Sequence, residues 1–340
     1  METVPSSGSV ALASPPPNWV RSRHPLGWLI DRVLAVDPLR QVLFWQARRL
    51  IIGTAERRGI AWRQRRESLQ GRAEPLLAAS TNPATQPPAY YRARFHAYNA
   101  GNLCWQAACE AEQATDAMAL RVWPDEPLQP EAAQARLRQA IYDALAPCLP
   151  IPVSRALDLG CSVGVGTEAL QAWLQARQEQ PVRVEGLDLS PHMLAVARVR
   201  AEERAAAAGS SGATAPPVVW HHAAAEATGL PAGAYDLITL QFVCHELPAE
   251  ATRAVLREAA RLLRPGGVIA QVDQDPDSEV IRRLPAPIAT LLKSTEPYLE
   301  EYFSLDLPAA LQAAGFGAVR RVPCDPRHRV LVATRLTPSR

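Results

Sequence analysis

The second half of the chain alternates short apolar, β-branched runs with longer runs whose apolar residues recur at helical spacing. Helices are predicted over residues 166–176, 191–208 and 249–263. The predicted strands are the runs RALDLG, VRVEGLDL, PVVWHH, AYDLITLQF and GVIAQVD, in that order. This alternation predicts an α/β fold with a parallel sheet covered by helices on both faces. Such a sheet binds its ligand beyond the carboxyl ends of its strands.

Residues 25–70 have a different pattern, with apolar residues at helical spacing and a break predicted at Pro38. Arginines occupy the other faces. Residues 1–80 hold 12 Arg and 6 acidic residues, a net charge of +6, and the rest of the chain has 24 basic and 28 acidic residues, or −4. A basic helix of this kind can pack on its own domain, which is the interpretation we favour, or lie on an anionic membrane surface. Peripheral membrane contact through residues 25–70 is therefore a hypothesis.

These patterns divide the chain into four parts. Residues 1–24, rich in Ser, Ala and Pro, are predicted to be a disordered tail, and residues 25–80 a basic amphipathic helical extension. The linker-like stretch STNPATQPP leads into residues 81–153, which are predicted to form a helical lid and the N-terminal part of the main domain. Residues 154–340 are the predicted core of that domain, with an insertion near residues 278–307.

Composition excludes several classes of protein. With 48% apolar and 21% charged residues, disorder of the whole chain is excluded. The mildly acidic main part argues against nucleic-acid binding, which requires a strong basic patch. The six cysteines include no C-x-x-C pair and no histidine at ligand spacing, so we expect reduced thiols and no metal.

No membrane-spanning or secretory signal segment is predicted, so we expect a cytoplasmic protein, with membrane association as the hypothesis stated above. A transit segment in residues 1–24, which would imply an organelle stroma, is less favoured because Glu2 comes early and Arg21 late.

A glycine-rich turn is predicted between the first strand and the first helix of the core. It reads Asp158-Leu-Gly160-Cys-Ser162-Val-Gly164, followed by Val-Gly-Thr. Because glycine has no Cβ, such a turn can adopt unusual φ values and lets a ligand approach the backbone. The spacing matches neither the dinucleotide fingerprint G-x-G-x-x-G nor a phosphate-binding loop. It resembles motif I of class I S-adenosylmethionine-dependent methyltransferases, D-x-G-x-G-x-G, with Ser162 at the middle glycine.

Later segments resemble the other motifs of that family, in the right order from Ala156 to Asp273. Asp188 ends the second strand, where the resemblance implies an acid that binds both ribose hydroxyls of the cofactor. Met193 resembles an apolar residue that helps to enclose the adenine, and Ala225–Glu226 matches two positions of the family's D-A-E-x-L-P. The segments YDLI and LRPGG resemble the fourth strand and the turn into the fifth. The group with the greatest resemblance is the ubiquinone/menaquinone-biosynthesis-like methyltransferases (methyltransferase domain 11).

The resemblance implies a doubly wound, Rossmann-like sheet of seven mostly parallel strands with an α-helical N-terminal extension. It also implies S-adenosyl-L-methionine as the cofactor. The residues that it assigns to cofactor binding are Asp158, Gly160, Cys161, Ser162, Gly164, Asp188, Leu189, Met193, Ala225, Glu226 and Gln241. Taken singly, each has a structural explanation, as a turn acid, a helix N-terminal charge or a loop glycine. Their common order favours the family.

Methyl transfer from a sulfonium requires the acceptor atom to lie in line with the methyl group, and a general base where the acceptor starts protonated. His245, after the fourth strand, is the predicted base because its ordinary pKa lies near neutrality. Glu246 is a second candidate, and a packing role for His245 is equally open.

Tyr91 is the other predicted catalytic residue. It belongs to an aromatic segment that also contains Tyr90, His96, Tyr98 and Asn102, although clusters of this kind more often serve packing. The insertion near residues 278–307 is predicted to cap the acceptor side. The residues of this cap that are candidates to contact the acceptor are Glu296, Tyr298 and Tyr302. The alternative is that these residues only form the start and the exposed face of a helix.

The resemblance implies methyl transfer to a small, apolar or amphiphilic acceptor, with no nucleic-acid partner. One alternative is a nicotinamide-dependent oxidoreductase on a similar fold, which the glycine spacing opposes. Another is a non-catalytic relative that binds the cofactor, which Ser162 and Ala224 would favour as departures from the motifs. The sequence indicates neither the acceptor nor the oligomeric state.

Overall fold

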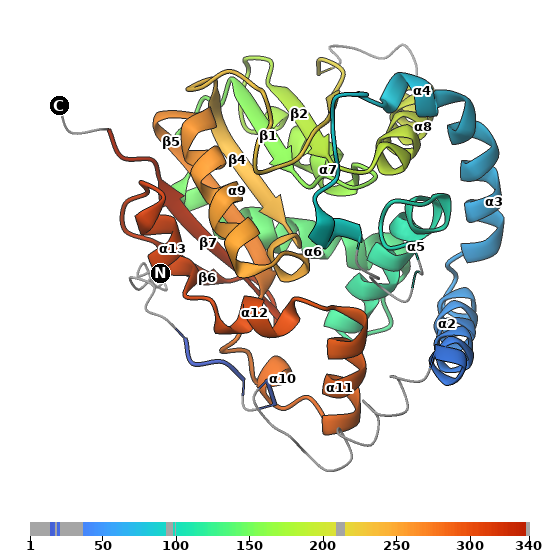
Figure 1. Ribbon diagram of the computed structural model, residues 1–340. Helices are drawn as coiled ribbons and strands as arrows, with labels where there is room; N and C mark the ends of the chain where they lie inside the picture. The colour runs from blue at the N-terminus through green and yellow to red at the C-terminus, as the bar shows by residue number, and fades with distance from the viewer. Residues whose placement is uncertain are drawn as a thin grey trace.

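A seven-stranded sheet with the strand order β3-β2-β1-β4-β5-β7-β6 forms the centre of the computed structural model (Figure 1). The structure describes residues 14–17, 19–20, 37–92, 98, 100–208 and 215–337. The strands are β1 Arg155–Leu159, β2 Arg183–Asp188, β3 Val219–His222, β4 Tyr235–Gln241, β5 Leu263–Gln274, β6 Arg320–Pro323 and β7 His328–Thr334. The first five pair in parallel, and β7 pairs antiparallel with both β5 and β6. The predicted α/β class and mostly parallel seven-stranded sheet are confirmed.

Successive residues of β1 enter different hydrophobic layers because side chains alternate along a strand. Ala156 packs with the cluster that contains Leu137 and Leu170, and Leu157 packs with the cluster that contains Leu256. Both faces of the sheet are therefore covered. The chain runs from β1 outward to β2 and β3, then returns to β4 on the other side of β1. This reversal of strand order makes the β1–β4 boundary the expected ligand crevice.

The longer helices of the core are α5 Trp105–Val122, α6 Pro130–Leu145, α7 Val165–Gln175, α8 Pro191–Ala208 and α9 Ala249–Leu262. Of these, α7, α8 and α9 agree to within one residue at each end with the predicted helices 166–176, 191–208 and 249–263. One prediction was wrong: LRPGG is not a turn that precedes β5 but lies within that strand. Leu263 pairs with Tyr235 and Val268 pairs with Leu237, so the register shifts here and Gly266 adopts a φ of 80°. The glycine permits a bulge, and the strand continues through it.

The N-terminal helices pack on the core. They are α2 Asp37–Arg57, α3 Trp62–Ala73 and α4 Leu77–Ser80, joined by the 3-10 helix η1 Glu74–Leu76 and followed by η2 Ala89–Arg92. Helix α3 contacts α5 and α8, and its residues Leu69 and Ala73 are fully buried. Residues 37–80 therefore pack against the core of the domain. Pro38 lies in the first turn of α2, and the predicted helix before it lies outside the described residues.

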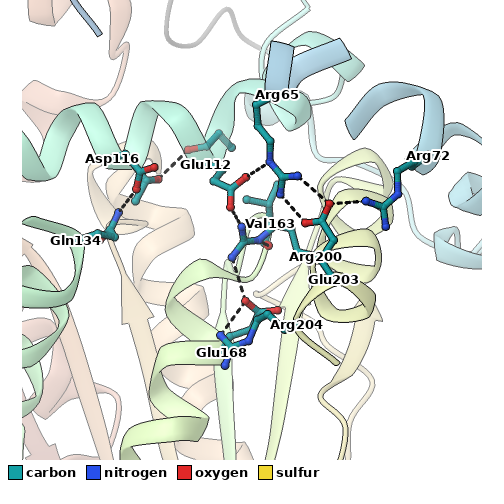
Figure 2. Close-up of polar contacts among 12 residues, drawn as sticks. Arg65, Arg72, Glu112, Asp116, Gln134, Val163, Glu168, Arg200, Glu203 and Arg204 are labelled. Carbon is teal, nitrogen blue, oxygen red and sulfur yellow. Dashed lines mark hydrogen bonds and ion pairs between the residues drawn. The ribbon is translucent and has the colours of Figure 1, made fainter. Parts of the chain in front are cut away.

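The arginines of α3 pair with acidic residues of the core (Figure 2). The guanidinium of Arg65 bonds to Glu203 on α8 through two contacts, of 2.7 and 2.8 Å, and to Glu112 on α5 at 2.7 Å. Arg72 also pairs with Glu203, and Arg200 on α8 pairs with Glu112. Arginines that contribute to the basic excess of residues 1–80 therefore form ion pairs with acidic residues of the core, and the opposite net charges of the two parts of the chain are complementary.

Four short helices follow β5: α10 Glu279–Arg282, α11 Ala286–Thr295, α12 Leu299–Ser304 and α13 Leu307–Ala313. In Figure 1 the arrowhead of β4 points toward α12, which contacts the 3-10 helix η4 Cys244–Glu246. The predicted insertion thus lies at the carboxyl ends of the strands, where a cap on the acceptor side would lie. We refer to α10–α12 as the cap.

Part of the predicted disordered tail is packed instead. The Trp19 indole donates a hydrogen bond of 2.7 Å to the carbonyl of Ile281 and meets the ring of Phe303 edge to face. Trp19 and Val20 are buried, and the Ser14 hydroxyl donates to Asp277 at 2.6 Å. The prediction was wrong for residues 14–17 and 19–20 because a low-charge, proline-rich composition hides one large apolar anchor. Residues 1–13, 18 and 21–36 lie outside the described residues.

Two further observations concern membrane-spanning helices and the cysteines. Across the described ranges, no helix has the length and apolar character needed to cross a membrane. All six cysteines are free thiols.

Candidate active site

The glycine-rich turn connects β1 to α7 through the unusual φ values that its sequence predicts. Gly160 and Gly164 have φ values of 75° and 80°. Ser162, at the middle glycine of the motif, has a φ of 50°, which is uncommon for a residue with a Cβ. Its main-chain N–H donates a hydrogen bond of 2.8 Å to Asp188. That bond from the neighbouring strand holds the turn in place, so the motif conformation persists without the glycine.

Asp188 ends β2 and faces the turn. One carboxylate oxygen accepts the N–H of Ser162 and the other accepts the N–H of Ser190, both at 2.8 Å. Burial raises the pKa of Asp188 to about 6, although these backbone donors oppose the shift. Each carboxylate oxygen has a second lone pair, so the group can also accept hydrogen bonds from a ligand. This is the placement that a ribose-binding acid requires.

A cavity of about 560 Å³ opens at the carboxyl ends of β1, β2 and β4, and its volume suits a small molecule. Of the predicted cofactor residues, those that line it are Asp158, Gly160, Cys161, Ser162, Asp188, Leu189, Met193, Ala225, Glu226 and Gln241. Gly164 has a different position. A Cβ on Gly164 would lie 2.5 Å from the Trp220 ring, so this glycine permits close packing against β3.

Asp158 is held by the protein itself. Its carboxylate accepts hydrogen bonds from the Thr167 hydroxyl at 2.7 Å, the Thr239 hydroxyl at 2.6 Å and the Gln241 amide at 3.1 Å. Burial raises its pKa, and the three hydrogen bonds oppose the shift. The residue therefore ties β1 to α7 and β4. Its contribution to the cavity is to hold Gln241 and the turn in position.

Residues 81–92 cross the molecule beside the cavity. The Thr85 hydroxyl and the main-chain N–H of Asn82 bond to the carbonyl and the ring of His222, both at 2.9 Å. The Tyr90 hydroxyl donates to Glu226, and the Tyr298 hydroxyl of the cap donates to the carbonyl of Tyr90 at 3.1 Å. This segment thereby connects β3, the cavity rim and the cap.

Tyr91 lines the cavity, as its assignment to the site requires. Burial, reinforced by the nearby carboxylates of Asp188 and Glu246, raises the pKa of its hydroxyl well above the ordinary value. The phenol therefore stays protonated and can donate a hydrogen bond, but it does not act as a base. His96 lies outside the described residues.

His245 lies in η4, directly after β4, and pairs with a carboxylate that the motifs did not indicate. Its Nδ1 is 2.8 Å from an oxygen of Asp273, and its main-chain N–H donates to the other oxygen at 3.2 Å. Asp273 is the penultimate residue of β5 and is fully buried. The sequence signal was available, because the run GVIAQVD places an acid at the same sheet edge as the end of β4.

The pair changes the proton affinity of the histidine. Burial alone would lower the pKa of His245, but the Asp273 carboxylate outweighs it and raises the pKa to about 9. The assumption of an ordinary pKa near neutrality was therefore wrong. At neutral pH the imidazole is mainly protonated and forms an ion pair with Asp273. Compared with a histidine of ordinary pKa, the neutral imidazole is then a stronger base, but a smaller fraction of the protein has it in the neutral form at pH 7.

The remaining predicted polar residues surround this pair. Glu246 accepts a hydrogen bond of 2.8 Å from the Asn102 amide and lines the cavity. Glu296, at the junction of α11 and α12, is buried and also lines it. Tyr302 approaches the His245 ring edge to face, at 6.4 Å between centroids, but its hydroxyl donates to the carbonyl of Gln274. Tyr302 therefore packs the histidine.

The cavity fits S-adenosylmethionine in three respects. The turn brings backbone without side chains to its floor, Asp188 lies where a ribose would meet a carboxylate, and Met193 and Leu189 supply apolar contacts for a base. Carboxylates of Asp188, Glu226 and Glu246 also border the cavity, and negative charge favours a sulfonium cation.

Comparison with known proteins agrees with this geometry. Residues 157–271 match the family model described as a methyltransferase domain. The chain is 27% identical to an uncharacterized methyltransferase of Synechocystis over 170 residues, which are 50% of this chain and 70% of that protein. It is 29% identical to a ubiquinone biosynthesis O-methyltransferase of Xanthomonas campestris over 203 residues, which are 58% of this chain and 76% of the relative.

A solved structure of phosphoethanolamine N-methyltransferase 2 from Haemonchus contortus, in complex with S-adenosyl-L-methionine, aligns with a TM-score of 0.43 and 16% identity. The alignment covers 58% of this chain and 53% of that one, so the chain spans about half of its length. With the matched domain running from β1 into β5, across the glycine turn and Asp188, the chain is a class I S-adenosylmethionine-dependent methyltransferase.

Proposed function

We propose that this enzyme methylates a hydroxyl group of a small, mainly apolar or amphiphilic acceptor, with His245 as the general base. The observation that carries the proposal is the His245–Asp273 pair beside the cavity. The bound cofactor supplies an electrophilic methyl group on a sulfonium. A hydroxyl must lose its proton to attack it, and the curated Xanthomonas relative is named as an O-methyltransferase.

The pair supplies the proton acceptor. Asp273 engages Nδ1 of His245, which leaves Nε2 as the ring nitrogen for the acceptor. In its neutral form, Nε2 accepts the hydroxyl proton as the oxygen attacks the methyl group, and Asp273 stabilises the resulting imidazolium. The proton then leaves to solvent, and the products are the methyl ether and S-adenosylhomocysteine.

The chemistry of the cavity walls supports an apolar acceptor. On α5, Ala107, Ala111, Ala114 and Met118 recur at helical spacing and line the cavity. Ile51 and Ile52 of α2 and Phe242 after β4 add to this apolar wall. Small alanine side chains leave room for a ligand, and an apolar wall gains free energy by removing apolar ligand surface from water.

The test is to incubate the protein with methyl-labelled S-adenosylmethionine and a metabolite extract of the source organism, followed by mass spectrometry of labelled products. The expected result is label in an apolar or amphiphilic compound as a methyl ether, absent with His245→Ala. Label on nitrogen would contradict the hydroxyl acceptor. Tight binding of S-adenosylhomocysteine without transfer to any compound would favour the non-catalytic alternative.

We also propose that α2 contacts an anionic membrane surface, from which an amphiphilic acceptor would enter. Trp45 and Leu50 are 59% and 69% exposed, and the Arg49 guanidinium lies 5.4 Å from the Trp45 ring centroid. Exposed aromatic and aliphatic residues beside arginine suit the membrane interface. The double variant Trp45→Ser/Leu50→Ser is expected to reduce pelleting with phosphatidylglycerol vesicles at least fivefold, which corresponds to about 1 kcal/mol of binding free energy.

The matched control for this membrane experiment is Leu336→Ser, which removes an exposed leucine near the other end of the chain. It is expected to pellet like the unaltered protein. Equal pelleting of the double variant and the control would exclude α2 as the contact.

A further inference from the structure

The described residues near the N-terminus, 14–17 and 19–20, form what we call the strap, and the strap packs against the cap and the turn before it. Its hydrogen bonds run from the Ser14 hydroxyl to Asp277 at 2.6 Å, from the Trp19 indole to the Ile281 carbonyl at 2.7 Å, and from the Lys293 ammonium to the Val20 carbonyl at 3.4 Å. Figure 1 shows the dark blue strap beside α10. Trp19 and Val20 are 6% and 5% exposed, so the contact excludes water.

A row of aromatic rings connects Trp19 to the predicted base. The centroids are 5.3 Å apart for Trp19 and Phe303, 5.0 Å for Phe303 and Tyr302, and 6.4 Å for Tyr302 and His245. All three pairs meet edge to face, an arrangement that the charge distribution of aromatic rings favours. The Tyr302 hydroxyl donates to the Gln274 carbonyl at 2.6 Å and so fixes the row at the end of β5. The position of the imidazole therefore depends on a residue of the strap through two intervening rings.

The strap also holds the helix that forms the cap side of the cavity. Leu292, Thr295 and Glu296 line the cavity, and their i, i+3, i+4 spacing places them on one face of α11 and its C-terminal end. Lys293 follows Leu292 and therefore lies on a different face, where it donates to the Val20 carbonyl. The strap thus contacts one face of α11 while another face borders the cavity.

The cap helices are too short to hold these positions alone. Helix α10 has four residues, α11 has ten and α12 has six. Isolated helices shorter than about 12–15 residues are marginal in water, and helices in proteins are stabilised mainly by packing. Trp19 contacts α10 through Ile281 and α12 through Phe303, and Val20 contacts α11. Removal of the indole is therefore expected to loosen the whole cap.

We propose that Trp19 is a positioning residue of this enzyme, which fixes the His245 imidazole through Phe303 and Tyr302 and the cavity wall through α11. The inference rests on the function proposed above only where His245 acts as the base. A residue that merely anchored the N-terminal segment would contribute stability without affecting the titration of His245. That titration therefore separates the two roles.

The charged groups around the imidazole determine the direction of the expected change. Burial lowers the pKa of His245, but the carboxylates of Asp273, Glu296 and Glu246 outweigh it and raise the pKa to about 9. A cap that moves away takes the Glu296 carboxylate with it, and water that enters screens the Asp273 carboxylate. The same water relieves the burial, but the carboxylates have the larger influence because the pKa lies above its ordinary value. The pKa is therefore expected to fall toward 6.5.

The experiment follows the ring signals of His245 by NMR against pH in protein loaded with S-adenosylhomocysteine, with His245→Ala to assign them. In Trp19→Ala the midpoint is expected at lower pH, with a rise of about threefold or more in the neutral fraction at pH 7. Hydrogen exchange of residues 279–304 is expected to be roughly tenfold faster, and that of β1 unchanged. Trp19→Phe keeps a ring beside Phe303 and is expected to retain most of both properties.

Two further variants keep the test decisive if Trp19→Ala folds poorly. Phe303→Leu interrupts the row of rings but retains a buried apolar side chain, and it is expected to reproduce the change in titration. The matched control is Trp123→Ala. It removes an indole at the end of α5, whose ring centroid lies 4.2 Å from the Arg136 guanidinium carbon, and is expected to leave the His245 titration unchanged.

An unchanged titration of His245 in both Trp19→Ala and Phe303→Leu overturns the proposal, whatever the exchange of the cap shows. The same change in Trp123→Ala overturns it as well, because the effect would then not be specific to the row of rings. These measurements do not require turnover. Failure of the proposed function would appear separately, as unchanged methyl transfer by His245→Ala.

Discussion

His245→Ala is expected to lower kcat by about two to four orders of magnitude, the usual contribution of a positioned general base. The imidazole is the group that receives the acceptor proton, so chemistry slows. The affinity for S-adenosylhomocysteine is expected to stay within a factor of two, because the predicted cofactor-binding residues, Asp188 and the glycine turn, are held by hydrogen bonds that do not involve His245. Single-turnover rates and calorimetric titration of the same samples check both statements. Unchanged turnover would remove His245 from the mechanism.

The pH dependence of the same step follows from the Asp273 pair. Because the pKa of His245 is about 9, the neutral, proton-accepting form increases as pH rises, and kcat/KM is expected to rise about tenfold per pH unit from pH 6 toward 9. Asp273→Asn removes the carboxylate that raises this pKa, so the rising limb moves to lower pH while the maximum rate falls.

The control for the pH profile is Glu250→Gln, which neutralises an exposed acid on α9. Its profile is expected to coincide with that of the unaltered protein. A rate that is independent of pH between 6 and 9, or a limb that does not move in Asp273→Asn, would contradict His245 as the base.

Removal of residues 1–80 is expected to abolish cofactor binding. The deletion takes away Ile52 and Trp62, which line the cavity, and Leu69, which is fully buried between α3 and the core. It also exposes Glu112 and Glu203 by removing their Arg65 partner. The measurement is calorimetric titration of the truncated chain with S-adenosylhomocysteine, together with its thermal unfolding.

A point variant tests the packing of α3 on the core without shortening the chain. Leu69→Ala is expected to lower the free energy of unfolding by about 3 kcal/mol, because it leaves a cavity next to Met193 and Val196 of α8. Glu67→Ala, an exposed neighbour on the same helix, is expected to change it by less than about 0.5 kcal/mol. Full cofactor affinity in the truncated chain would show that the N-terminal helices are a separate unit after all.

Local signals in the sequence were sufficient to predict the strands of the sheet and the glycine-rich turn that lines the cavity. Strands that are buried on both faces appear in the sequence as continuous apolar runs. The positive φ values of the turn normally require glycine, and Ser162 adopts one because Asp188 on the neighbouring strand accepts a hydrogen bond from its N–H. Helix α8 was predicted at its observed bounds, Pro191–Ala208. Each of these features depends on residues that are close together in the chain.

Features that join distant segments were missed. The partner of His245 is 28 residues away on strand β5, and the pKa shift of the histidine depends on that contact. Arg138 donates a hydrogen bond to Gln241, 103 residues away, and no motif connects them. The acidic partners of the α3 arginines were not predicted, because net charge carries no information on which acids these arginines meet. Pairings of this kind are properties of the fold.

The contact between Trp19 and Ile281 has a consequence for the growing polypeptide. The two residues are 262 positions apart. At a translation rate of about 5–20 residues per second, Ile281 is synthesised roughly 13 to 52 seconds after Trp19. Strands β1 to β4 and the turn that faces the cofactor are complete within that interval. The contact that fixes Trp19 against the cap can therefore form only after β1 to β4 have been synthesised.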